Sequence, residues 1–281
     1  MTTAKSRWLG VLGWPVEHSR SPQIHTAALE ATGIDAVYLP LAVPPAALAS
    51  AITGLRALGA LGANVTLPHK ERVMEHLDAI EPAALASGAV NTIVREGDRL
   101  IGANTDGDGL ARALHEGGVE LDGARVLLIG GGGAARASVR GLLDAGARAI
   151  TVGARRIEQA EQLAAGEPSL SALALADTRA LEDAARGADL FVQASSATLG
   201  DRDPAFAASL PIDALPAHAT VIDLVYAPLE TSVLRAAAAR GLRTVDGLGM
   251  LVWQAALAFE RWHGVAAPIE VMRRAALPTA G

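Results

Sequence analysis

The sequence predicts an α/β protein built from two domains. Apolar, strand-like segments alternate with segments of helical periodicity along the chain, which is the pattern of a layered α/β fold. The 281 residues correspond to about two domains of roughly 150 residues each. Hydrophobic residues make up 51% of the chain and charged residues 19%, which is enough to build two buried cores.

Composition excludes several classes of function. The net charge of -6 and the absence of a Lys/Arg block argue against nucleic-acid binding. The chain has no cysteine, which excludes disulfides, thiolate metal sites and cysteine nucleophiles. Glycines and a proline interrupt the apolar segment near the N-terminus, and three prolines interrupt the longest apolar run, at 36–52. We therefore expect a cytoplasmic protein with neither a secretory signal nor a membrane span.

The first half of the chain alternates between strands and helices. We expect Ser21 to cap a helix that has Pro22 at its first position. The expected strands of this half are 8–14, 36–41, 62–67, 89–94 and 99–104. The other expected helices are 44–58, one that begins at Pro68, and 82–87.

A second α/β region begins near Asp106. Its expected strands are 124–130, 149–155, 173–177, 188–195 and 219–226, and its clearest helices are 134–146 and 232–241. The last two helices, 249–264 and 267–277, have no strand to pair with, so we expect them to pack back on the first domain. The predicted domains are therefore 1–105 with 248–281, and 106–247.

The strongest local motif is "LLIGGGGAARA" at 127–137. It places Gly130-x-Gly132-x-x-Ala135 between a buried strand and a helix, within a β-α-β unit. This is the context of a Rossmann-type fingerprint, in which glycines let backbone N–H groups approach a pyrophosphate at a helix N-terminus. A tight turn without a ligand is the alternative, but the complete β-α-β unit favours dinucleotide binding.

The end of the second strand of this unit indicates which dinucleotide is bound. NAD-selective sites usually have an acidic residue there, whereas arginine suits the 2′-phosphate of NADP. This chain has Ala154, Arg155 and Arg156, and two guanidinium groups can clamp a phosphate. Solvated surface arginines are the alternative, but their position favours NADP(H).

Polar side chains follow several strand ends of the first half. Ligands of open α/β sheets bind at the carboxyl ends of the strands, so these groups could converge on one crevice. Each also has an ordinary explanation as a helix cap, a turn residue or a surface charge. The residues in question are Ser19, Ser21, Thr66, Lys70, Asn91 and Asp106.

Seven motifs, in order and spacing, resemble those of the shikimate dehydrogenase family. They are "VLGWPVEHSRSPQIH", "GANVTLPHKE", "SGAVNTIV", "IGANTDGDG", "LLIGGGGAARA", "DLVYAPLETSVL" and "DGLGMLVWQAALAFERWHG". The resemblance covers nearly the whole chain. It implies reversible, NADP-dependent reduction of 3-dehydroshikimate to shikimate in aromatic amino acid biosynthesis. It also implies an N-terminal substrate domain, a Rossmann-type dinucleotide-binding domain and an active site in the cleft between them.

The resemblance also implies a role for individual residues. Lys70 and Asp106 would be the catalytic pair. The substrate would be held by Ser19 and Ser21 at its carboxylate and by Thr66, Asn91 and Gln254 at its ring hydroxyls, with Asp106 and Tyr226 nearby. The phosphate loop would comprise Gly130, Gly131, Gly132, Gly133 and Ala134. The 2′-phosphate segment would be Ala154, Arg155 and Arg156, and Leu224 and Gly247 would complete the cofactor site, with Gly247 approaching the nicotinamide.

The chain departs from the family pattern at two places on the cofactor side. The usual Asn-Arg-Thr after the second strand is Ala154-Arg155-Arg156 here, and Gln159 replaces a frequent arginine. Gln193 replaces the asparagine of the common Asn-Ala-Thr segment. The first departure alters the 2′-phosphate site, and the second alters the loop beside the cofactor.

Two roles for Lys70 stay open at this point. At the start of a helix beginning at Pro68, the helix dipole would disfavour its protonated form, whereas Asp106 would stabilise it. Lys70 could therefore be the proton-transferring group or an electrostatic clamp on the forming alkoxide.

Three other functions compete with this interpretation. A quinate or aminoshikimate dehydrogenase using NAD(P) is the closest, although the two serines of "HSRSP" favour shikimate. A non-catalytic dinucleotide sensor would need no equivalent of Lys70 and Asp106. A metalloenzyme is disfavoured because the seven histidines lack metal-binding spacing. We expect a small-molecule substrate as partner, and either a monomer or a homodimer.

Overall fold

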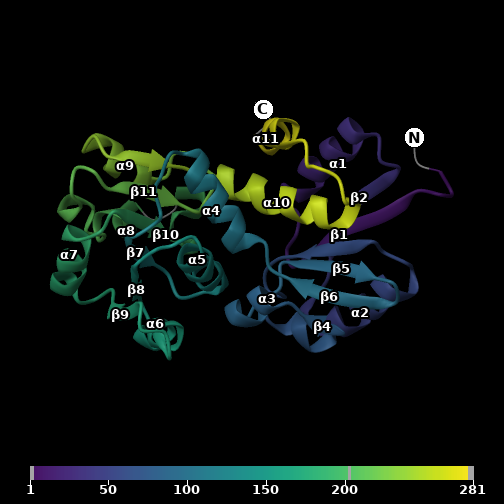
Figure 1. Cartoon of the computed structure of the whole chain (residues 1–281), viewed down its shortest axis with the longest axis horizontal. Coiled ribbons are helices and arrows are strands. Elements are labelled where there is room, and N and C mark those ends of the chain that lie inside the picture. Colours follow the sequence, from purple (N-terminus) through teal and green to yellow (C-terminus); the bar gives the residue numbers. More distant parts are fainter. Residues whose placement is uncertain (1–2, 202–203, 278–281) are drawn as a thin grey trace. The chain divides into compact units, whose positions relative to one another are not determined.

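The computed structural model describes residues 3–201 and 204–277 (Figure 1). The chain divides into two compact units, one made of 1–109 with 252–281 and the other of 110–251. Helices α4 (Asp106–Glu116) and α10 (Leu248–His263) each cross from one unit into the other. Among the described residues, no helix has both the length and the apolar character needed to cross a bilayer.

The first unit is built on a mixed sheet. In spatial order the sheet comprises β2 (Ala36–Ala42), β1 (Arg7–Gly13), β3 (Gly62–Val65), β5 (Thr92–Glu96), β6 (Arg99–Ala103) and β4 (Ala79–Ile80). Strand β1 pairs in parallel with β2 and β3, whereas β5 is antiparallel to both β3 and β6. The helical elements are α1 (Ser21–Thr32), η1 (Pro45–Ala47), α2 (Leu48–Ala57), η2 (Arg72–His76), α3 (Pro82–Ser87) and α11 (Ile269–Ala276), where η denotes a 3₁₀ helix.

The C-terminal helices complete the first unit, as predicted. Helix α11, in yellow, lies beside α1, in purple (Figure 1). The indole N–H of Trp262 on α10 donates to the carbonyl oxygen of Ile93 at 2.9 Å. This contact passes over Gly62, where a Cβ atom would overlap both the Ile93 oxygen and the indole. A glycine is therefore needed at Gly62 for α10 to approach the sheet so closely.

The second unit is a parallel sheet with Rossmann topology. Its spatial order is β12 (Arg243–Val245), β11 (Thr220–Asp223), β10 (Leu190–Gln193), β7 (Arg125–Ile129), β8 (Ala149–Ala154) and β9 (Leu170–Ala174). The helical elements are α5 (Gly133–Asp144), α6 (Ile157–Ala164), α7 (Thr178–Arg186), η3 (Ser196–Asp201), α8 (Pro204–Ala208), η4 (Ile212–Ala214) and α9 (Ser232–Ala239). The order reverses between β7 and β10, which is the switch point where such sheets bind ligands.

The predicted fold class is confirmed, and three local predictions are wrong. Ser21 is the first residue of α1 rather than its cap; Arg20 holds the cap position, and no side chain caps the helix. Strand β9 begins at Leu170, three residues before the predicted start, because the residues of 170–175 are apolar apart from Ser171 and give no sharp boundary. No helix begins at Pro68; the next helical segment is η2, which starts at Arg72.

Candidate active site

Lys70 lies in a turn between β3 and η2. Its backbone carbonyl accepts a hydrogen bond from the N–H of Val90 at 2.8 Å, so it is not used in a helix. The N–H of Met74, which a helix would direct to Lys70, instead bonds to the carbonyl of Glu71. No helix therefore begins at Pro68, and the helix dipole that was predicted to act on Lys70 is absent at this position.

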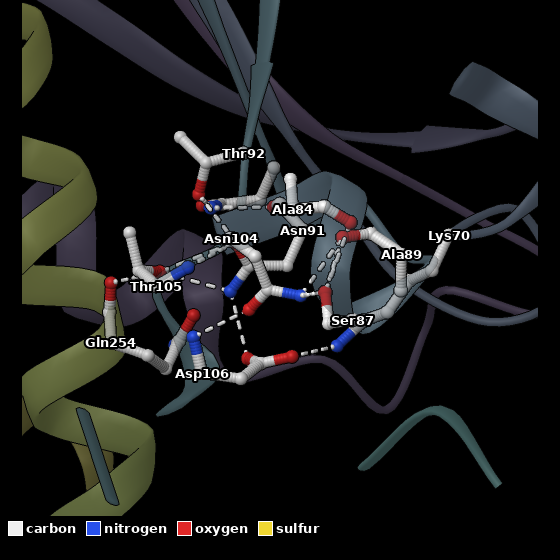
Figure 2. A network of polar contacts seen from close by, with 11 residues as sticks. Lys70, Ala84, Ser87, Ala89, Asn91, Thr92, Asn104, Thr105, Asp106 and Gln254 are labelled. Atoms are coloured by element: carbon white, nitrogen blue, oxygen red, sulfur yellow. Dashed lines mark hydrogen bonds and ion pairs between the residues drawn. The ribbon is translucent and has the colours of Figure 1, made fainter. Parts of the chain in front are cut away.

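Lys70 forms an ion pair with Asp106 (Figure 2). Its Nζ atom lies 2.6 Å from Oδ2 of Asp106, and the two side chains are 20% and 9% exposed. Asp106 is the first residue of α4 and is separated from the end of β6 by Asn104 and Thr105. A carboxylate is favoured at that position because unpaired N–H groups and the positive end of the helix dipole lie there.

A buried amide fixes the other oxygen of this carboxylate. The Nδ2 atom of Asn91 donates to Oδ1 of Asp106 at 2.7 Å and to Oγ1 of Thr105 at 2.9 Å. The Oδ1 atom of Asn91 accepts from the backbone N–H of Thr105 at 2.9 Å and from the hydroxyl of Thr92 at 2.9 Å. Asn91 therefore connects the start of β5 to the start of α4 and holds the Asp106 carboxylate in position.

Asn104 anchors the backbone around this pair. Its Oδ1 atom accepts from the N–H of Asp106 at 2.9 Å, and its Nδ2 atom donates to the carbonyl of Ala89 at 2.9 Å and to Ser87 at 3.1 Å (Figure 2). Asn104, Thr105 and Thr92 were not among the site residues predicted from the sequence. They could have been predicted from their position beside Asn91 and Asp106, in polar segments rich in turn-forming residues.

Gln254 joins the same network through its backbone. The hydroxyl of Thr105 donates to the carbonyl oxygen of Gln254 at 3.0 Å, which links α10 to the turn before α4. The described network thus combines a cation, a carboxylate and an amide from segments far apart in sequence (Figure 2). Chemically, such a group can hold a hydroxyl and move or stabilise its proton.

The other residues of the first unit that were predicted to bind substrate follow the carboxyl ends of β1 and β3. The Oγ atom of Ser19 accepts from the N–H of Ser21 at 3.3 Å, and the Ser21 side chain is buried. Thr66 directly follows β3, and its methyl group packs over Gly13 at the end of β1. The structure records no direct contact of these three side chains with the Lys70–Asp106 pair.

The glycine-rich loop of the second unit connects β7 to α5. A Cβ on Gly130, which has φ +140°, would lie 3.1 Å from the backbone of Ala194 after β10, so the loop passes close to that neighbouring strand end. By contrast, a Cβ on Gly132 or Gly133 would have no neighbour within 4 Å. Gly132 is the N-cap of α5, and Ala134 is exposed in its first turn. The loop therefore leaves open space in front of free helical N–H groups.

The predicted 2′-phosphate segment follows the neighbouring strand β8. Ala154 ends the strand and is buried, while Arg155 and Arg156 are exposed in the turn before α6. Gln159 leans over the glycine-rich loop, since a Cβ on Gly131 would lie 2.7 Å from the Cβ of Gln159. Both arginines thus follow the carboxyl end of β8, at the same edge of the sheet as the loop after β7.

Gln193, the second departure, holds the loop after β10. Its Oε1 atom accepts from the N–H of Ser195 at 2.7 Å, and its Nε2 atom donates to Thr198 and to the carbonyl of Ser195, both at 2.9 Å. Nε2 also lies 3.3 Å from Oδ1 of Asp223 at the end of β11. Burial raises the pKa of Asp223, while its hydrogen bonds act in the opposite direction. Gln193 is therefore a buried organiser of this loop.

The last predicted cofactor residues meet beyond β11. Gly247 packs directly on the backbone of Leu224, where a Cβ atom would collide with the Leu224 carbonyl. Tyr226 lies two residues further along and is half-buried within the second unit. The glycine is thus required for the close approach of these two chain segments.

Comparison with known proteins assigns the chain to a family. The model of the shikimate dehydrogenase substrate-binding domain matches residues 11–93, that of shikimate/quinate 5-dehydrogenase matches 109–200, and that of the shikimate 5′-dehydrogenase C-terminal domain matches 247–277. The chain is 46% identical to the shikimate dehydrogenase (NADP(+)) of Symbiobacterium thermophilum, over 96% of this chain and 94% of that protein. It is 44% identical to the enzyme of the same name from Geobacter metallireducens, over 98% and 97%.

A solved structure extends this similarity to the fold. Shikimate 5-dehydrogenase of Thermus thermophilus, in complex with NADP(H) and shikimate, superposes with a TM-score of 0.86 at 41% identity. The superposition covers 96% of this chain and 98% of that one. With three models matched in order and relatives aligned over nearly their full length, the chain belongs to the shikimate dehydrogenase family.

Proposed function

We propose that this protein catalyses the reversible NADP-dependent oxidation of shikimate to 3-dehydroshikimate, in the cytoplasm, as a step of aromatic amino acid biosynthesis. The observation that carries the proposal is the Lys70–Asp106 ion pair held by Asn91. A protein that only senses a dinucleotide has no use for such a pair. The names of the full-length relatives, shikimate dehydrogenase (NADP(+)), support the same activity.

The second unit supplies the NADP(H) site in this proposal. Gly132 and Gly133 leave the space that a pyrophosphate requires, in front of the free N–H groups of α5. Arg155 and Arg156 supply positive charge for the 2′-phosphate. The end of β8 has Ala154 in place of the acidic residue that would bind the ribose of NAD. Leu224 and Gly247 would border the nicotinamide. When bound, the nicotinamide accepts the hydride in oxidation and returns it in reduction.

The first unit supplies the substrate site. Ser19 and Ser21 would hold the substrate carboxylate through their hydroxyl groups, and Thr66, Asn91 and Gln254 would bind the ring hydroxyls, assisted by Tyr226. Hydroxyl and amide groups can both donate and accept, so they can match a polyol at several positions. The proposed substrate is accordingly a small, polyhydroxylated carboxylic acid.

Lys70 moves the proton of the reacting hydroxyl, and Asp106 balances its charge. Lys70 and Lys5 are the two lysines of the chain, whereas its remaining basic side chains, apart from histidine, are arginines. An arginine would provide the same positive charge but cannot release a proton in a protein. The lysine at position 70 therefore supports a proton-transfer role over a purely electrostatic one. In reduction, its ammonium group donates to the forming alkoxide.

A spectrophotometric assay tests the proposal. Shikimate and quinate are each combined with NADP⁺ and with NAD⁺, and the formation of reduced nicotinamide is followed. We expect the highest kcat/KM for shikimate with NADP⁺. Turnover of quinate alone, or of neither acid, would reject the proposed function.

A further inference from the structure

Three buried polar side chains connect to Asn91 through hydrogen bonds but are not among the residues proposed to bind substrate or cofactor or to catalyse the reaction. They come from three strands of the first sheet: Tyr38 from β2, Asn64 from β3 and Thr92 from β5. Their exposed fractions are 5%, 5% and 0%. Buried polar groups are costly unless they are paired, and apolar residues of similar shape could fill the same space. Their pairing therefore calls for an explanation.

These side chains form one continuous chain of hydrogen bonds. The Tyr38 hydroxyl donates to Oδ1 of Asn64 at 2.6 Å. The Nδ2 atom of Asn64 lies 3.2 Å from Oγ1 of Thr92, whose hydroxyl donates to Oδ1 of Asn91 at 2.9 Å. Asn91 then donates to Asp106 at 2.7 Å. We call Tyr38, Asn64 and Thr92 the β2–β5 relay.

The direction of donation along the relay is determined by backbone groups. The N–H of Thr105 can only donate, so the atom of Asn91 that faces it is the amide oxygen. The carbonyl of Asn91 can only accept, so the Asn64 atom 3.2 Å away is the amide nitrogen. Each donor therefore points toward Asp106, and Asn91 cannot flip without placing its oxygen against the carboxylate.

The surroundings of the relay keep it neutral. His25 from α1 stacks on Tyr38 with ring centroids 4.3 Å apart, and Phe259 and Trp262 from α10 complete the enclosure. Burial, reinforced by the charge of His263, lowers the pKa of His25 to about 3, and burial raises the pKa of Tyr38. His25 and Tyr38 are therefore both uncharged near neutral pH.

We propose that Tyr38, Asn64 and Thr92 are positioning residues for the reaction: they lock the Asn91 amide so that its NH₂ group serves Asp106. With one carboxylate oxygen occupied by Asn91, the other is oriented toward Lys70. The relay thereby sets the geometry of the catalytic pair. This inference rests on the proposed function, because the pair must do proton chemistry for the relay to affect turnover.

The test removes one hydroxyl from the relay at constant shape. Thr92→Val should lower kcat for shikimate oxidation by about tenfold, since a slightly misplaced catalytic group loses much of its effect. The pH profile of kcat should change with it, because the relay positions the carboxylate that balances the charge of the proton-moving amine. Thr92→Ser, which keeps the hydroxyl, should restore both the rate and the profile.

Two further variants separate positioning from packing. Tyr38→Phe, at the far end of the relay, should give a smaller loss in the same direction. Thr220→Val makes the same change at a buried strand threonine in the second unit and should leave kcat and the pH profile unchanged. Circular dichroism at the assay temperature measures the folded fraction of each variant, and each kcat is divided by that fraction.

The outcomes distinguish this inference from the proposed function. If the wild type does not oxidise shikimate, the proposed function fails. If the wild type is active but Thr92→Val keeps its full rate and profile, the relay is without effect. If Thr92→Val and Thr92→Ser lose activity equally and the profile does not move, the residues serve packing only, and the inference is overturned.

Discussion

Nζ of Lys70 lies 2.6 Å from Oδ2 of Asp106, in a site that the rest of the first unit largely shields from water. The two residues are 36 positions apart in the chain and follow different strands, β3 and β6. Two opposite charges held this closely and partly desolvated interact more strongly than they would on the surface. The pair also places an amine beside a negative charge, an arrangement that can accept or donate the proton of a hydroxyl group.

Removing the amine should abolish most of the activity. Lys70→Ala should lower kcat by about 10²-fold or more, the usual contribution of a positioned acid or base. The dissociation constant for NADP⁺ should change little, because the proposed cofactor residues belong to the second unit. Steady-state kinetics and fluorescence titration measure the two quantities. Lys5→Ala, at the exposed second lysine, is the control and should retain full activity. A Lys70→Ala enzyme within a few-fold of wild type would contradict the role.

Replacing the amine by a guanidinium should separate charge from proton transfer. Lys70→Arg retains a cation that can pair with Asp106, yet arginine does not deprotonate in proteins. We expect its kcat to be close to that of Lys70→Ala. A Lys70→Arg enzyme that keeps most of the wild-type rate would show that the charge alone is sufficient and that another group carries the proton.

The two arginines after β8 should determine cofactor selectivity. Replacing Arg155 and Arg156 together by alanine should weaken NADP⁺ binding by about tenfold or more, since each charge-assisted contact contributes roughly 1.5–3 kcal/mol. Binding of NAD⁺, which lacks the 2′-phosphate, should change far less. Isothermal titration calorimetry with both cofactors measures the difference. Arg179→Ala, at an exposed arginine of α7, serves as the control. Equal losses for both cofactors would reject the assignment.

The buried imidazole of His25 should make the protein acid-sensitive. Its folded-state pKa of about 3 lies below the ordinary value of 6.5, chiefly because burial disfavours the charged form and secondarily because His263 repels it. Below pH 6.5 the unfolded chain binds a proton that the folded protein does not bind. Stability conferred by neutral His25 is therefore present above pH 6.5 and is lost as the pH falls toward 3, by up to about 1.4 kcal/mol per pH unit.

A phenylalanine at this position should remove that dependence. His25→Phe keeps the stacking on Tyr38 but cannot be protonated, so its unfolding free energy should fall less between pH 7 and pH 5 than that of the wild type. Urea denaturation at several pH values measures the slopes. His115→Gln, at an exposed histidine, should keep the wild-type slope. If His25→Phe and the wild type have parallel curves, the imidazole is not the acid-sensitive group.

The approach of α10 to the sheet should depend on Gly62. Gly62→Ala places a methyl group against the carbonyl of Ile93 and the indole of Trp262, so one of these must move. We expect a loss of roughly 1–3 kcal/mol in unfolding free energy, as for other overpacked sites. The matched control is Gly54→Ala, within α2, where a Cβ meets no neighbour within 4 Å. That change should stabilise the protein by roughly 0.5–1 kcal/mol, so the two substitutions should shift the melting temperature in opposite directions.

Local patterns in the sequence determined much of this protein. Continuous apolar runs such as 126–129 predict strands buried on both faces, and the glycines after them predict a phosphate-binding turn, because both depend on neighbouring residues alone. The candidate residues Lys70, Asn91 and Asp106 were likewise identified from their positions after strand-like segments. These features depend on short-range properties of the chain, namely side-chain size, hydrophobic periodicity and backbone conformational freedom.

The tertiary structure alone decided how these residues are used. Lys70 is in a turn rather than a helix because the N–H of Val90, twenty residues on, takes its carbonyl. Thr105 contacts the backbone of Gln254 across 149 positions, and Tyr38 meets Asn64 across an intervening strand. Such contacts depend on sheet order and on the path of α10, so no local pattern encodes them. The physical reason is that a hydrogen bond to a distant segment competes with the local one, and only the folded chain brings the distant donor within reach.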